Sequence, residues 1–182
     1  MRNIEAKFKL ADLARAEKAA LALGYRPAGL LRQRDTFFNV ASGKLKLREE
    51  ERGAWLIFYR RQKHGDAIEN HGGLTRSAYE LMRSDYEIIS IAEPERMRAL
   101  LSEALGLLAE VRKERTLLLR DNVRLHLDRV AELGEFGEIE AVLADRADPE
   151  RSRAAVDELL EALGIARIDL IEVSYFELLR AR

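Results

Sequence analysis

The 182-residue sequence contains no cysteine, only three prolines and a single tryptophan. Without cysteine, disulfide bonds and thiolate–metal sites are excluded. Acidic and basic residues are numerous but nearly equal in number, 32 Asp and Glu against 31 Lys and Arg, which leaves a net charge of −1. Such a balance offers no broad electrostatic field, so we expect neither nucleic acid nor a membrane as a partner.

Long apolar runs are also missing, and none approaches the roughly 20 residues that span a bilayer. Residues 1–5 lack the apolar stretch of a secretory signal. No G-x-x-x-x-G-K-[ST] run occurs, so a P-loop does not hold phosphate here. The length fits one domain, 1–182. We therefore expect a cytoplasmic protein, monomer or homodimer, that binds anions through local clusters of basic side chains.

Three helices are indicated by the residues at their ends, and a short helix is expected near the C-terminus. Proline at the first helical position and glycine just past the last are typical helix boundaries. Glu93-Pro94 and Asp148-Pro149 supply two such starts, and Gly106 and Gly164 supply the stops. The expected helices cover 12–23, 93–105, 148–163 and, as a short C-terminal helix, 175–182.

Six segments alternate polar and apolar residues with period two, which is typical of strands with one buried face. They cover 3–10, 44–49, 55–60, 111–120, 123–128 and 138–141. Glycine-rich residues 61–77 are expected to form a long mobile loop. Runs of strands, with helices in the longer gaps, indicate an α+β fold built on an antiparallel sheet.

Charge is sorted among these strands in an unusual way. Lys44, Lys46 and Arg48 put three cations on one face, and like charges repel unless an anion lies among them. Glu138 and Glu140 put two carboxylates on one face, where a divalent cation would neutralise them. A single charged face is ordinary for an antiparallel sheet. Because whole strands differ in sign, we interpret the charged faces as meeting across a shared interior.

A triphosphate and its metal ion require both kinds of face. The phosphate chain carries about four negative charges, which Arg and Lys neutralise and orient. Carboxylates hold Mg²⁺ or Mn²⁺, which bridges phosphate oxygens. The sequence therefore predicts a site for a small triphosphate together with a divalent cation.

Seven short motifs, in this order, resemble the CYTH family, also called triphosphate tunnel metalloenzymes. They are N-I-E-A-K from residue 3, D-T-F-F from 35, G-K-L-K-L-R-E from 43, K-E-R from 113, R-L-H-L-D from 124, E-I-E from 138 and S-Y-F-E-L-L from 174. Each is weak alone, but the ordered set spans nearly the whole chain. The resemblance implies an eight-stranded antiparallel β-barrel, the triphosphate tunnel, with flanking helices.

The resemblance also implies roles for individual residues. Phosphate would be bound by Lys46, Arg48, Arg60, Arg76, Lys113, Arg115 and Arg124. Mg²⁺ or Mn²⁺ would be bound by Glu5, Glu138 and Glu140, together with Asp128. Lys7 would be catalytic, either contacting phosphate or accepting a proton. Asn3 stands where the family has its first glutamate, which removes one charge from the metal site.

Three functions remain open at this level. A metal-dependent hydrolase of inorganic triphosphate or a small organic triphosphate needs only the cationic clamp, the metal and an oriented water. A class IV adenylyl cyclase, which makes cyclic AMP from ATP, needs an adenine pocket as well, and no sequence feature indicates one. The third is a noncatalytic module that binds triphosphate or polyphosphate, which the uncharged Asn3 suggests.

Several aromatic and histidine residues have a structural and a functional interpretation. Trp55, Phe58 and Tyr59 could stack on a base or a thiazole ring, but packing in a strand core is the simpler expectation. His126 is expected as a hydrogen-bonding wall residue rather than a metal ligand. Tyr175 and Phe176 are expected to dock the last helix or to plug one mouth of the tunnel.

Overall fold

The computed structural model describes residues 2–62, 81–143 and 148–182. In these ranges the chain forms eight strands, four α-helices and one short 3-10 helix. The strands are β1 (Arg2–Lys9), β2 (Arg26–Phe38), β3 (Lys44–Glu50), β4 (Gly53–Gln62), β5 (Leu81–Ile91), β6 (Leu107–Arg120), β7 (Val123–Val130) and β8 (Gly134–Leu143). The helices are α1 (Leu13–Ala22), α2 (Pro94–Leu105), α3 (Pro149–Leu163), the 3-10 helix η1 (Arg167–Asp169) and α4 (Tyr175–Arg180).

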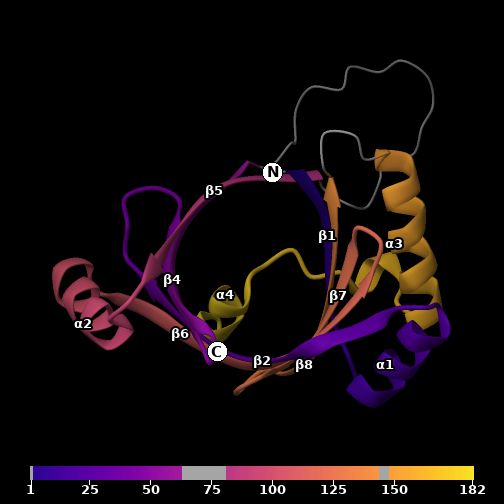
Figure 1. Ribbon diagram of the computed structural model, residues 1–182, viewed down its shortest axis with the longest axis horizontal. Coiled ribbons are helices and arrows are strands. Elements are labelled where there is room, and N and C mark those ends of the chain that lie inside the picture. The colour runs from indigo at the N-terminus through magenta and orange to yellow at the C-terminus, as the bar shows by residue number, and fades with distance from the viewer. Residues whose placement is uncertain (1, 63–80, 144–147) are drawn as a thin grey trace.

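The strands form one closed antiparallel barrel in the order β1-β5-β4-β3-β2-β6-β7-β8. Closure comes from β8, which pairs with every residue of β1 from Arg2 to Lys9. Figure 1 looks down the resulting ring, with α1 and α3 together on one side and α2 on the other. The predicted α+β class and eight-stranded antiparallel barrel are confirmed.

The helices begin and end at the residues that the sequence indicated. Asp12 caps α1 by accepting a hydrogen bond from the amide of Arg15, and Asp148 caps α3 in the same way. Such caps satisfy amides that have no partner within the helix. Gly164 ends α3 in the left-handed conformation, with φ of 69°, which glycine adopts without steric cost.

The main apolar core lies outside the barrel, between β1, β7, β8 and the two helices α1 and α3. Side chains alternate across a strand, so one face of each strand points to these helices. Ile4, Phe8, Leu125 and Ile139 are fully buried in this layer, with helical partners that include Val156. The opposite, polar faces of the same strands are thereby turned toward the barrel interior.

The alternation of polar and apolar residues in the sequence did not predict strands β2 and β5. The start of β2 contains Pro27 and Gly29, and the register with β6 shifts between them. Both residues weaken a strand pattern. In β5 the adjacent Ile88 and Ile89 occupy opposite faces, so apolar residues do not alternate with polar ones. The expected loop lies mostly in 63–80, outside the described residues.

Helix α4 is seen within the ring in Figure 1. The segment before it is fixed to β1, because the amide of Ile171 donates to the carbonyl of Lys7 at 2.7 Å. Helix α2 is attached differently, through two hydrogen bonds from Arg98 to the Glu49 carboxylate at 2.6 and 2.7 Å. In the described ranges, no helix has the length and apolarity needed to cross a membrane.

Candidate functional site: a charge-lined barrel interior

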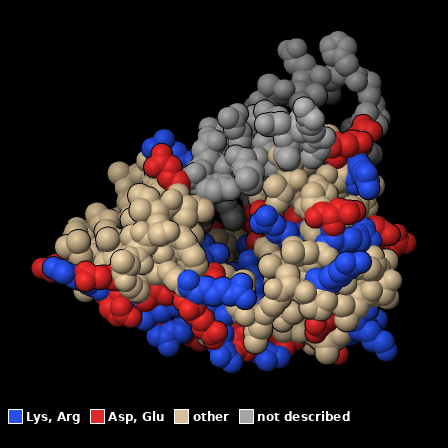
Figure 2. Space-filling view, in the orientation of Figure 1, with Lys and Arg blue, Asp and Glu red and all other residues tan. Residues whose placement is uncertain are grey.

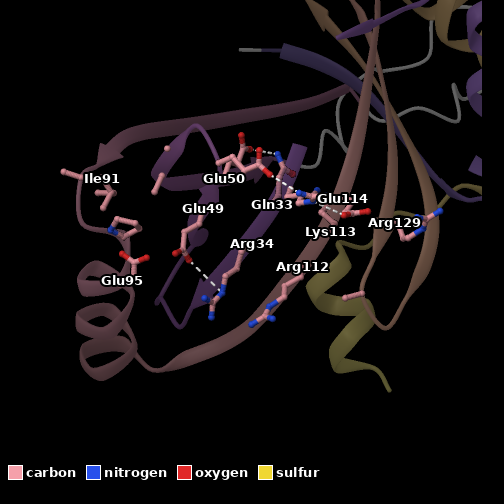
Figure 3. Close-up of a pocket in the computed structure, with 17 residues that line it drawn as sticks. Gln33, Arg34, Glu49, Glu50, Ile91, Glu95, Arg112, Lys113, Glu114 and Arg129 are labelled. Atoms are coloured by element: carbon pink, nitrogen blue, oxygen red, sulfur yellow. Dashed lines mark hydrogen bonds and ion pairs between the residues drawn. The ribbon is translucent and has the colours of Figure 1, made fainter. Parts of the chain in front are cut away.

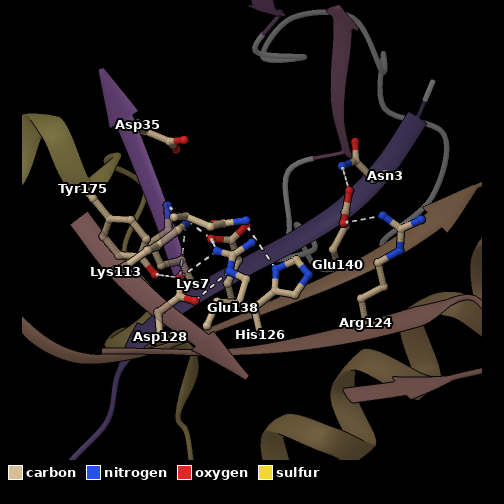
Figure 4. A network of polar contacts seen from close by, with 12 residues as sticks. Asn3, Lys7, Asp35, Lys113, Arg124, His126, Asp128, Glu138, Glu140 and Tyr175 are labelled. Carbon is tan, nitrogen blue, oxygen red and sulfur yellow. Dashed lines mark hydrogen bonds and ion pairs between the residues drawn. The ribbon is translucent and has the colours of Figure 1, made fainter. Parts of the chain in front are cut away.

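Charged side chains on the inner faces of β1, β6, β7 and β8 contact one another in the barrel interior (Figure 4). The buried side chains include the charged groups Lys7, Asp35, Lys113, Arg115 and Asp128, and also His126. Burying a charge is costly unless it is paired and hydrogen-bonded. Figure 2 shows Lys and Arg side chains gathered around a hollow on the face of the molecule that Figure 1 presents.

Asp35 on β2 holds the two inward cations of β3. Its carboxylate accepts hydrogen bonds from Lys46 at 2.9 Å and from Arg48 at 2.7 and 2.6 Å. Burial alone would raise the pKa of Asp35, but the charges of Lys46 and Arg48 lower that pKa far below its usual value. The anion that the Lys44–Arg48 face required is therefore partly supplied by the protein itself.

Asp128 on β7 likewise holds the two inward cations of β6, Arg115 and Lys113. Its two oxygens accept hydrogen bonds from Arg115, both at 2.6 Å, and Lys113 lies 3.5 Å from Oδ2. The Tyr175 hydroxyl of α4 donates to Oδ2 as well, at 2.9 Å. Burial would raise the pKa of Asp128, yet Lys113 and Arg115 lower it to about 2.

Glu138 on β8 joins Lys7 to the same cluster. Its Oε2 lies 4.0 Å from the Lys7 ammonium and 3.4 Å from Arg115. His126 lies beside it, with Nδ1 3.7 Å from Oε1. Burial and the charge of Arg115 lower the pKa of His126, which favours the neutral imidazole at neutral pH. His126 was expected as a hydrogen-bonding wall residue, and it does lie in the wall, but its buried Nδ1 has no hydrogen-bond partner among the described residues.

Positive charge exceeds negative charge at the centre of the described interior. Five cations meet three carboxylates there: Lys7, Lys46, Arg48, Lys113 and Arg115 against Asp35, Asp128 and Glu138. Burial, followed by the charge of Arg115, lowers the pKa of Lys113 to about 7. Burial, followed by the charge of Arg48, lowers that of Lys46 to about 8. The cluster is therefore suited to a polyanion.

A second group of residues lies at one corner of this interior, where β1, β7 and β8 meet. Glu5 and Glu140 are direct cross-strand partners, and Glu140 is also the partner of Arg124. The Asn3 amide donates to Glu140 at 2.7 Å, and Arg124 lies 3.4 Å from the other carboxylate oxygen. Figure 4 shows Asn3 and Arg124 on either side of Glu140.

This corner suits a hard divalent cation that arrives with its ligand. The described residues contain no group of three His, Cys, Asp or Glu placed to hold a metal ion by themselves. Mg²⁺, however, is usually bound by one or two carboxylates together with substrate phosphates and water. Glu5, Glu140 and the amide oxygen of Asn3 offer donors of that kind, so the donor set fits such a metal.

Helix α4 blocks one end of the interior with aromatic and charged groups. Phe176 packs on Phe37 with ring centroids 4.8 Å apart, and Glu177 lies 3.3 Å from the Lys44 ammonium. The Tyr175 ring lies 4.7 Å from the Lys7 ammonium. A cavity of about 380 Å³ remains beside Phe176 and Lys44. The sequence expectation that Tyr175 and Phe176 dock the last helix agrees with these contacts.

A larger cavity, of about 850 Å³, lies beside the barrel near the start of α2 (Figure 3). Arg34 and Glu49 form a 4.0 Å ion pair in its wall. Gln33 and Lys113 are lining residues shared with the polar interior. Arg32, Arg112 and Glu114, which also line it, lie on outward positions of β2 and β6, so the cavity adjoins the polar network without containing it.

Three predicted site residues need correction or lie elsewhere. Arg60 was expected to bind phosphate, but it is exposed on the outer face of β4 and donates to the Ser42 hydroxyl at 3.4 Å. Asp128 was expected to bind metal, yet both of its oxygens are engaged by Arg115 and Tyr175. Arg76 lies outside the described residues.

The sequence reasoning did not assign roles to Asp35, Tyr175 or Glu177 within the charged network. Gln33, Asp35 and Phe37 alternate along β2 and therefore share its inward face. Had β2 been recognised in the sequence, this alternation would have indicated that the Asp35 side chain points inward. No sequence signal pairs Tyr175 with Asp128, because the contact joins two elements 47 residues apart.

Comparison with known proteins agrees with this architecture. A provisionally named adenylate cyclase from Methanocaldococcus jannaschii is 26% identical over 187 residues, which cover 98% of each chain. A solved structure from Pyrococcus horikoshii has a TM-score of 0.75 at 20% identity, covering 97% of this chain and 98% of the other.

A Hippeastrum protein, named as an adenylyl cyclase and described as having a dominant triphosphatase activity, has a TM-score of 0.63 at 18% identity. The alignment covers 99% of this chain and 95% of the Hippeastrum chain. At these identities the structural likenesses establish the fold alone. The sequence model of the CYTH domain matches residues 1–175. The chain therefore belongs to the CYTH domain family.

Proposed function

We propose that this protein hydrolyses triphosphate compounds in the barrel interior with the help of Mg²⁺ or Mn²⁺. The observation that carries the proposal is the arrangement of two carboxylate-anchored cation pairs within one closed barrel. Asp35 fixes Lys46 and Arg48, and Asp128 fixes Arg115 beside Lys113. Cations held in advance stabilise developing charge without reorganising, which is the main requirement of phosphoryl transfer.

In this proposal each group of side chains has one task. The guanidinium groups of Arg48 and Arg115 bind phosphate oxygens, and Lys46 and Lys113 neutralise the remaining charge. Lys7, held beside Glu138, contacts the terminal phosphoryl group. The oxygen of a water molecule attacks the terminal phosphorus, the bond to the bridging oxygen breaks, and the protons of the water leave on the products.

Glu5, Glu140 and Asn3 would hold the divalent cation. When bound there, the ion would supply positive charge that neutralises the charge developing on the phosphate in the transition state. Arg124 lies against Glu140 in the described structure and would exchange this carboxylate for a phosphate oxygen. Glu138 is assigned to Lys7 and Arg115 in preference to the metal, because these cations already surround it.

A phosphate-release assay tests the proposal. The panel contains inorganic triphosphate, ATP and thiamine triphosphate, each with Mg²⁺ or Mn²⁺ and each repeated with EDTA. We expect release that EDTA abolishes and that Arg48→Ala strongly reduces, while Arg32→Ala, on the exposed outer face, leaves it unchanged. Tight binding by calorimetry without any product would instead identify a noncatalytic binding module.

Class IV adenylyl cyclase is the second candidate, and the name of the archaeal relative favours it. In that reaction the ribose 3′-oxygen attacks the α-phosphorus and diphosphate leaves. The same cation pairs would then stabilise the leaving diphosphate. Mass spectrometry of the ATP reaction decides between the two, because cyclic AMP and ADP differ in mass.

A further inference from the structure

The inner surface of the barrel changes from charged to apolar between β3 and β4. Residues directly opposite each other in an antiparallel pair point to the same face. The register across β2, β3, β4 and β5 therefore defines two inward rows. One row contains Asp35, Arg48, Trp55 and Ser90, and the next contains Phe37, Lys46, Ile57 and Ile88.

The apolar residues that β4 and β5 contribute to these rows do not belong to either core cluster of the described residues. The clusters lie between the barrel and α1 and α3, and around α4. Trp55, Ile57 and Tyr59 are only partly buried, and Ile88 is 52% exposed although it faces inward. Large apolar side chains left accessible beside a polar cluster mark a surface that a ligand covers.

The distance from this apolar surface to the cations matches one molecule with two unlike ends. Neighbouring strands lie about 4.8 Å apart, so β4 and β5 begin roughly 5 to 10 Å from the cations of β3. Tyr59 marks the boundary, because its ring centroid lies 5.9 Å from the Lys46 ammonium. A sugar places a base at a comparable separation from its α-phosphate.

An unsatisfied acceptor beside the rows favours a nucleobase over a purely apolar group. Gln33 is 5% exposed, and its Nε2 donates to Glu50 at 2.5 Å. Its Oε1 is buried without a hydrogen-bond partner among the described residues. Its partner Glu50 pairs with Gly53, two residues from Trp55, so the amino group of a base at the Trp55 end of the wall would supply the missing donor.

We propose that Trp55, Ile57, Tyr59 and Ile88 form a base-binding wall, so that the ligand of the tunnel is a nucleoside triphosphate rather than inorganic triphosphate. The proposal rests on the proposed function for the phosphate end of the ligand. A base-binding role explains why the aromatic residues Trp55 and Tyr59 point inward, whereas packing in a core cluster does not. A flat base stacks on aromatic rings whatever its identity, so the wall selects a class of ligand and not one nucleotide.

The fluorescence of Trp55 tests the wall directly, because it is the only tryptophan in the chain. The full chain is titrated with ATP and with inorganic triphosphate, each with Mg²⁺, and binding is confirmed in parallel by calorimetry. We expect ATP to quench the emission at saturation and inorganic triphosphate to leave it nearly unchanged. Equal spectral changes with the two saturating ligands would overturn the proposal.

Two adjacent isoleucines supply a matched pair of variants. Ile88→Ala shortens the inward side chain opposite Ile57, and Ile89→Ala shortens an outward side chain of similar exposure opposite Leu56. We expect Ile88→Ala to weaken ATP binding several-fold and Tyr59→Leu to weaken it about tenfold, a loss typical of base stacking. Inorganic triphosphate affinity should stay within about twofold for both, and Ile89→Ala should change neither affinity.

The outcomes separate this proposal from the proposed function. If no triphosphate binds or is hydrolysed, the phosphate site itself is wrong and the wall proposal fails with it. If inorganic triphosphate is bound and cleaved as well as ATP, and the wall variants affect both alike or neither, hydrolysis stands and the base-binding wall does not.

Discussion

The hydroxyl of Tyr175 donates a hydrogen bond of 2.9 Å to Oδ2 of Asp128, inside the barrel and 47 residues away in the chain. The same oxygen accepts a 2.6 Å hydrogen bond from Arg115. Burial and the nearby carboxylates Glu138 and Asp128 raise the pKa of Tyr175, so its hydroxyl keeps its proton and remains a donor. The C-terminal helix is thereby coupled to the carboxylate that positions a cation of the tunnel.

Tyr175→Phe should lower the free energy of unfolding by about 0.5–1.5 kcal/mol, because one buried hydrogen bond is lost while Asp128 keeps Arg115. Tyr25→Phe is the matched control, since the buried Tyr25 hydroxyl has no hydrogen-bond partner in the described structure. We expect it to be neutral or stabilising. Urea denaturation of both variants measures the difference, and equal losses would contradict the assigned hydrogen bond.

Arg48→Ala should weaken triphosphate binding by roughly 10- to 150-fold, because a desolvated, charge-assisted contact is worth on the order of 1.5–3 kcal/mol. Arg48→Lys keeps the charge but loses the planar fork, so an intermediate loss is expected. Calorimetry with Arg32→Ala as the outer-face control measures the effect. Unchanged affinity in Arg48→Ala would show that β3 does not bind the ligand.

Triphosphate affinity should fall as the pH rises from about 7 to 9. The pKa of Lys113 is lowered to about 7 and that of Lys46 to about 8, so the free site loses positive charge across this interval. A bound polyanion favours the protonated forms, so binding near pH 8 should take up protons. Calorimetry in buffers of different ionisation enthalpy counts the protons taken up on binding. If no proton is taken up at pH 8, the lowered pKa values of Lys113 and Lys46 are contradicted.

The same lysines have the opposite effect on stability. In the unfolded chain a lysine holds its proton up to a pKa of about 10.4, so the unfolded state binds more protons than the folded state above pH 7. The destabilising contribution of these buried lysines is therefore fully present below about pH 7 and is relieved as the pH rises toward 10. In Lys113→Met the free energy of unfolding should therefore increase less between pH 7 and pH 10 than in the unmodified protein. Chemical denaturation at several pH values measures this difference.

Asn3→Glu should raise affinity for Mg²⁺ or Mn²⁺, because it adds a third carboxylate beside Glu5 and Glu140. It also removes the 2.7 Å hydrogen bond from the Asn3 amide to Glu140, so the metal-free protein should become less stable. Metal titration followed by calorimetry measures the first effect and thermal unfolding with EDTA the second. Asn3→Ala is the control, and equal metal affinity in both variants would place residue 3 away from the ion.

Local sequence patterns were enough for the helix ends and for six of the strands. Asp12, Asp148 and Gly164 act within a few residues of themselves, so their effect is visible in the sequence. β5 was missed because Ile88 and Ile89 are both apolar on opposite faces. The family resemblance placed Arg60 among the phosphate ligands, and only the register shows that it points outward.

The order of residues by itself determined which strand faces are charged, which are apolar and where the helices begin and end, because these properties depend on neighbours within a turn or a pleat. The tertiary structure decided which face became the interior, which carboxylate met which cation, and that Trp55 lies beside Arg48. Those relationships depend on strand register and on closure of the barrel, in which β8 pairs with β1 although the paired residues lie more than a hundred positions apart.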